Sequence, residues 1–134
     1  MNGVVYRVIP KQVVTVPATL PSSPLWISKG IDVTNYTQAV LIVRTHQGTN
    51  IGGGTGLQVS VYYDAPTSEE ATDFLPSPLT PIVSVTVAPA TSLGTFQLAV
   101  IGTSGLSGYL RVGLIWPSSS SGQAVISADI CAKC

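Results

Sequence analysis

Hydrophobic and polar residues alternate with a period of two along most of the chain. In residues 57–64, LQVSVYYD, the odd-numbered positions are Leu, Val, Val and Tyr, whereas the even-numbered ones are Gln, Ser, Tyr and Asp. A similar alternation runs through 109–116 and 124–131, and it places Phe96, Leu98 and Val100 opposite Gln97 and Ala99. Because successive side chains of a strand point to opposite faces, this pattern predicts strands with one face toward a core.

Eight segments have this strand character, and glycine, proline and serine separate them. They are residues 4–9, 12–16, 39–46, 57–64, 82–87, 95–102, 109–116 and 124–131, with a further short strand expected at 25–28. The run AVLIV (39–43) is apolar on both faces, which is typical of a central strand or of one that a partner covers. The only helical candidate is 67–75, where Thr67 and Glu70 fit a capping box. The sequence therefore predicts one all-β domain over residues 1–134, an antiparallel β-sandwich or barrel of about eight strands.

Charge is scarce in this chain. Charged residues make up 9%, where about 25% is usual, and six basic residues balance six acidic ones. No charge occurs from Phe74 to Leu110, while 15 Ser and 14 Thr supply much of the polarity. Either a hydroxyl-rich surface is sufficient for solubility, or other subunits cover much of the surface. We favour the second reading, which predicts a homo-oligomer, a trimer or another state, with residues 74–110 contributing to its contacts.

Several classes of partner do not fit the composition. Nucleic-acid binding needs clustered Lys and Arg, whereas the six basic residues are scattered singly. No run of 18 apolar residues exists, so we expect no membrane partner. The beginning MNGVVYRVIPK lacks the pattern of a signal peptide, so we expect a protein used without secretory export.

Residues 46–58, HQGTNIGGGTGLQ, hold five of the thirteen glycines and raise the question of a nucleotide site. A phosphate-binding loop needs a strand before it, a helix after it and, in its best-known form, a lysine. Here an alternating strand follows, and no lysine lies between positions 30 and 132. The segment is therefore predicted to be a hairpin connection. Its length, and that of PSSSSG (117–122), suit ordering against a neighbouring subunit.

Candidate chemistry is sparse, and we predict no enzyme, no catalytic residue, no cofactor and no metal. CAKC (131–134) and the single histidine, His46, fall short of a four-ligand zinc site, and no helix precedes the thiols. Plain thiols are the favoured interpretation, with a disulfide or a partial intersubunit metal site as alternatives. Any Ser-His-Asp arrangement would depend on His46, and Glu69 and Glu70 lie in a polar segment where solvation is expected. A pair of carboxylates across a cleft, as in glycosidases, stays open.

Two features suggest contacts with other proteins. Residues 4–16 form strands almost from the start of the sequence, so they lie inside the sheet or add to the sheet edge of a neighbour. Trp116 falls on the apolar side of its segment and is predicted to be core, whereas Tyr62 and Tyr109 fall on the polar side and suit interface packing or a sugar platform. The candidate interface residues are Val4, Val5, Tyr6, Ile51, Tyr62 and Tyr109.

Three segments resemble small β-sandwich proteins of tailed bacteriophage particles. They are SKGIDVTNYTQAVLIVRTH (28–46), GTFQLAVIG (94–102) and GYLRVGLIWPSSSSGQAVISADICAK (108–133). The resemblance implies a jelly-roll-like sandwich and a capsid decoration protein without catalytic residues. It would be made in the host cytoplasm, would contact the major capsid protein and copies of itself, and would lie on the surface of the phage head. The alternatives are a carbohydrate-binding sandwich that engages a host-surface glycan, and a head–tail or tail component.

Overall fold

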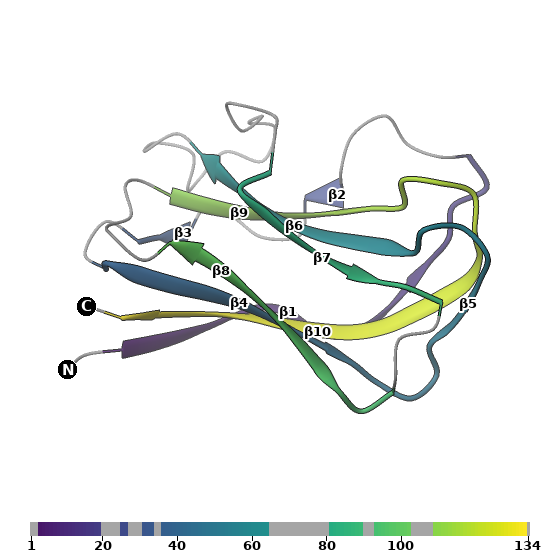
Figure 1. Ribbon diagram of the computed structural model, residues 1–134, viewed down its shortest axis with the longest axis horizontal. Coiled ribbons are helices and arrows are strands. Elements are labelled where there is room, and N and C mark those ends of the chain that lie inside the picture. The colour runs from purple at the N-terminus through teal and green to yellow at the C-terminus, as the bar shows by residue number, and fades with distance from the viewer. Residues whose placement is uncertain are drawn as a thin grey trace.

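A computed structural model describes residues 3–19, 25–26, 31–33, 36–64, 81–89, 93–102 and 109–133. Within these ranges it contains two five-stranded antiparallel sheets and no helix, so no helix is long and apolar enough to cross a membrane. The sheets stack face to face (Figure 1), which confirms the antiparallel β-sandwich. The strands are β1 (Gly3–Thr15), β2 (Leu25–Trp26), β3 (Ile31–Asp32), β4 (Gln38–Thr45), β5 (Asn50–Gly52), β6 (Leu57–Asp64), β7 (Val83–Val87), β8 (Phe96–Gly102), β9 (Tyr109–Ile115) and β10 (Ser121–Lys133).

The strand order is that of a jelly roll. The first sheet has the order β1-β10-β4-β8, and β5 continues along β10 beyond β4. The second sheet has the order β2-β9-β6-β7, and β3 also pairs with β9. Counting β4 with β5 and β2 with β3 leaves eight positions, of which the first pairs with the last, the second with the seventh, the third with the sixth and the fourth with the fifth. The jelly-roll-like arrangement of about eight strands is thus confirmed.

The core lies between the two sheets and is built from the inward residues of each strand. The predicted apolar sides of β6 and β9 point into it, and so do the apolar positions of β10 and the ring of Trp116. The residues of these elements in the core are Leu57, Val59, Val61, Leu110, Val112, Leu114, Trp116, Ala124, Ile126, Ala128, Ile130 and Ala132. As expected for AVLIV, β4 is a central strand between β10 and β8.

Two details of the first sheet depart from the sequence prediction. Residues 4–9 and 12–16 were expected as separate strands, yet β1 is one strand paired with β10 over its whole length. Pro10 is accommodated because the register shifts between Ile9 and Gln12, where a proline needs no ladder partner. This pairing places the first segment of the chain inside its own sheet.

The helical candidate 67–75 lies outside the described residues.

The short strand β5 was also not expected, and a threonine makes it possible. After β4 the regular backbone pairing with β10 is interrupted. Here the Thr49 side chain forms the hydrogen bonds that a backbone group would form in a regular sheet. Its Oγ1 accepts from the backbone N of Val125 at 2.9 Å and donates to the carbonyl of His46 at 2.9 Å. The chain then rejoins β10 at Asn50.

Candidate functional site

Strand β8 turns its apolar side away from the core. Phe96, Leu98 and Val100 are 54%, 58% and 55% exposed, whereas Gln97 and Ala99 point inward. The alternation expected from the sequence is therefore present, but its apolar face is the outer one. The cause is the register with β4, in which Ala99 and Gln97 lie beside the fully buried Leu41 and Val43.

The outward residues of β8 continue across the sheet into an apolar surface. Val100, Val40, Cys131 and Val5 face one another in register across β8, β4, β10 and β1, and Leu98 lies beside Ile42 in the next row. Val5 is 65% exposed. We call this surface the outer apolar band. It consists of Val5, Val40, Ile42, Phe96, Leu98, Val100 and Cys131.

Part of the outer apolar band is hollowed. The strands β1, β10 and β4 run side by side near the two ends of the chain (Figure 1). A depression of about 440 Å³ lies on these strands. Apart from Gln38 and Lys133 its side chains carry no charge or amide. It is lined by Gly3, Val4, Val5, Gln38, Ala39, Val40, Ile42, Cys131, Ala132 and Lys133.

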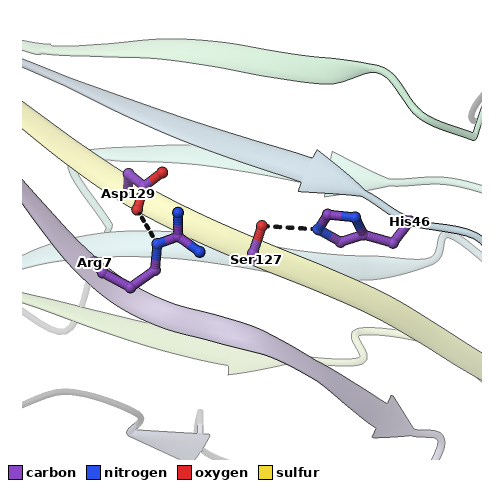
Figure 2. A network of polar contacts seen from close by, with 4 residues as sticks. All are labelled: Arg7, His46, Ser127 and Asp129. Atoms are coloured by element: carbon purple, nitrogen blue, oxygen red, sulfur yellow. Dashed lines mark hydrogen bonds and ion pairs between the residues drawn. The ribbon is translucent and has the colours of Figure 1, made fainter.

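A polar cluster lies on the same face, where the rows of Ile42 and Arg44 continue onto β10 and β1. Figure 2 shows Arg7 of β1 forming an ion pair with the largely buried carboxylate of Asp129 on β10. Ser127, two residues earlier on β10, is bonded through its Oγ to Nε2 of His46 at 2.8 Å. Desolvation lowers the pKa of His46, and the positive charges of Lys11, Arg44 and Arg7 lower it further.

The Ser127–His46 contact invites comparison with a catalytic triad. In a triad the acid bonds to the histidine nitrogen that does not face the serine, and so orients the ring. Asp129 instead engages Arg7 and lies on the far side of Ser127 from His46 (Figure 2). Ser127 is buried and does not line the depression. Among the described residues no group of three or more His, Cys, Asp or Glu is arranged to hold a metal ion.

The charges of this face are mostly positive. Arg44 lies over the ring of Phe96, with its guanidinium carbon 5.3 Å from the ring centroid. Lys133 stands at the rim of the depression, and Lys11 lies close enough to affect His46. The one described carboxylate on these strands is Asp129, which Arg7 already engages.

The glycine-rich and serine-rich loops contact each other. Ser118 Oγ accepts from the backbone N of Thr55 at 2.8 Å, and Ser120 Oγ donates to the carbonyl of Gly53 at 3.0 Å. Gly54 has a φ of 69°, and a Cβ there would collide with the serine loop, so this close approach requires glycine. The segment connects two strands, as predicted, but the prediction of a hairpin is wrong. β5 pairs with β10 in the first sheet and β6 belongs to the second sheet, so the segment crosses from one sheet to the other. The contacts that order it come from within the chain.

The candidate interface residues of the sequence analysis are distributed over different environments. Val5 is exposed in the outer apolar band, whereas Val4 and Tyr6 point inward and pack against the core. Ile51 and Tyr62 are buried, which corrects the expectation of exposed side chains at these positions.

The pairing of β5 with β10 holds Ile51 in the core. Ser60 is buried as well as Tyr62, which shows that the polar side of β6 is covered. Tyr109 lies in β9 by its backbone, and its side chain is outside the described residues. Cys131 is a half-buried free thiol of the band, and Cys134 lies outside the described residues.

The candidate interface residues named from the sequence include none of the outer residues of β4 and β8, although AVLIV was expected to be central or covered by a partner and residues 74–110 were expected to contribute to contacts. The run AVLIV is apolar on both sides, and a strand with a core on one face has no need of apolar residues on the other.

Comparisons with known proteins are sparse. The sequence matches no family model and no curated protein. Among solved structures, a chain of infectious bursal disease virus, Gt strain, is similar over 98% of this chain, with 11% identity and a TM-score of 0.42. A chain of the Gx strain is similar over 98%, with 14% identity and a TM-score of 0.41. This chain spans about a third of the length of those chains, at 32% and 31%.

Proposed function

We propose that this chain is a non-enzymatic structural protein of a virus particle, of the capsid decoration type, which binds the outside of the shell and stabilises it. The observation that carries the proposal is the outer apolar band, which the described part of the chain leaves uncovered. Contiguous exposed apolar patches of a few hundred Å² on a small protein commonly mark sites of interaction with other proteins.

Three further features support the proposal. Jelly rolls occur in viral capsid and lectin domains, which is an analogy of fold. The resemblance of residues 28–46, 94–102 and 108–133 to tailed-phage virion proteins favours the capsid over the lectin alternative. Tyr62, one of the two rings expected for a sugar platform, is buried.

The proposed mechanism is additive. A stable pairwise interface buries about 800 Å² on each partner, and a contact smaller than this is weaker on its own. Repeated over a symmetric shell, many weak contacts add up, and each copy that bridges neighbouring shell subunits opposes their separation. The partners in this proposal are the major capsid protein and other copies of this chain, and the site is the head surface of a phage particle.

The test uses shells assembled from the major capsid protein of the same virus without this protein. Purified protein is mixed with these shells, the mixture is sedimented and imaged, and the rupture temperature of the shells is measured. We expect regular added density on the outer surface and a higher rupture temperature. Protein that stays in the supernatant while the shells remain bare would contradict the proposal, and retention on a glycan array would favour the carbohydrate-binding alternative.

A further inference from the structure

The outer apolar band has the character of a docking surface because its side chains are apolar and adjacent, and each is exposed or partly exposed to solvent. Phe96, Leu98 and Val100 stand in a row on β8, which is at the edge of the first sheet. Natural edge strands are usually protected by a charge, a proline or a bulge that breaks the row. From Phe96 to Val100, β8 carries no charge and no proline, and its register shift with β4 comes only after Val100.

The depression beside this row can accommodate an apolar side chain of a bound partner. Its walls are the aliphatic side chains of Val5, Val40 and Ile42 and the thiol-bearing Cys131. Interfaces gain most of their binding energy from a few side chains that fill such hollows, surrounded by contacts that exclude water. An apolar side chain of the occupant would fill this one.

The charges around the band indicate the sign of the charge that a bound partner carries. Lys133 lies at one end, beyond the row of Cys131, and Arg44 lies at the other end, beside Phe96. Lys11 adds a third positive charge on the same side. Among the described residues no carboxylate pairs with these three cations, since Asp129 forms its ion pair with Arg7.

We propose that the outer apolar band docks on a protein surface that is apolar at its centre and carries carboxylates at its rim. This inference rests on the proposed function and assigns that surface to the outward face of the shell protein. Charge complementarity decides against a second copy in face-to-face contact, because two such faces would bring Arg44, Lys11 and Lys133 toward positive charges of the same kind.

The experiment compares substitutions of opposite charge at the same position, with binding to undecorated shells as the readout. Leu98→Glu and Leu98→Lys both remove an exposed leucine from the band. Gln38→Glu and Gln38→Lys change the charge at the rim, beside Lys133. Leu93→Glu is the matched control, because Leu93 is also an exposed leucine, 48% accessible, but lies in the turn before β8. Circular dichroism and urea unfolding check that each variant is folded.

We expect Leu98→Glu to weaken shell binding by at least about ten-fold and Leu98→Lys by clearly less. Gln38→Glu should weaken binding by roughly two- to five-fold, while Gln38→Lys should leave it unchanged or tighten it. Leu93→Glu should bind like the wild type. Higher salt should weaken wild-type binding, because the rim pairs are screened. If Leu98→Glu fails to fold, the Gln38 pair still decides the sign of the partner's charge.

Three results would overturn the inference, and each has its own signature. Binding that is reduced more by lysine than by glutamate at both positions would mean a basic partner. Wild-type-like binding by all four Leu98 and Gln38 variants would place the contact on another face while the proposed function stands. No binding of the wild type would remove the proposed function as well. Sedimentation velocity of the wild type and Leu98→Glu would then show whether a second copy covers the band.

Discussion

Gly122 is a position at which the structure leaves no room for a side chain. Its φ is 90°, and a Cβ there would overlap the carbonyl oxygen of Asn50 and lie 2.9 Å from the carbonyl carbon. The clash is with the backbone of β5, so Gly122→Ala must push β5 away from β10. Gly53 is the matched control, because its φ is 69° and a Cβ there would meet nothing within 4 Å.

The two substitutions share one cost and differ in another. Alanine at positive φ costs about 1–2 kcal/mol at either position. At Gly122 the displaced β5 also exposes Ile51, whose burial contributes about 1.5–3 kcal/mol. We expect Gly53→Ala to lower the free energy of unfolding by about 1–2 kcal/mol and Gly122→Ala by about 2.5–5 kcal/mol.

Urea unfolding at 25 °C followed by tryptophan fluorescence gives both values, and similar m-values would show that the same cooperative unit unfolds in each variant. Equal losses at the two positions would refute the argument, because they would mean that β5 does not hold its place on β10.

Three other substitutions test the polar contacts of the first sheet. Thr49→Val should lower the free energy of unfolding by about 1–3 kcal/mol, because the buried N–H of Val125 loses its acceptor; an unchanged urea midpoint would contradict this. Because the pKa of His46 is lowered in the folded protein, neutral His46 favours the folded state. This contribution to the free energy of unfolding is complete above about pH 6.5 and is lost as the pH falls through the folded-state pKa. His46→Gln should therefore flatten the dependence of the urea midpoint on pH, and a variant with the wild-type slope would speak against it. Arg7→Met should cost about 1–2 kcal/mol, because Asp129 is left without its cation while Arg7 itself is half exposed. Adding Asp129→Asn should recover part of that loss, and strictly additive costs would exclude the coupling.

The sequence by itself determined the fold class and most of the strands. Alternation is a local property of a strand, so the patterns of 57–64, 109–116 and 124–131 were enough to predict which residues share a face. The same reasoning excluded a phosphate site in residues 46–58, because an alternating strand follows the glycines. Trp116 was correctly placed in the core from its phase alone.

Only the tertiary structure decided which face of a strand is buried in the core and what its outer face contacts. The apolar side of β8 points outward because its pairing with β4 sets Ala99 beside Leu41, and no local pattern encodes that register. Ile51 is buried because β5 pairs with β10, which is distant in the sequence, and the serine loop contacts the glycine loop across more than 60 residues of chain. Period two thus defines two faces of a strand, and long-range pairing selects the one that becomes core. The outer apolar band could therefore be located only once the strands of the first sheet had been aligned.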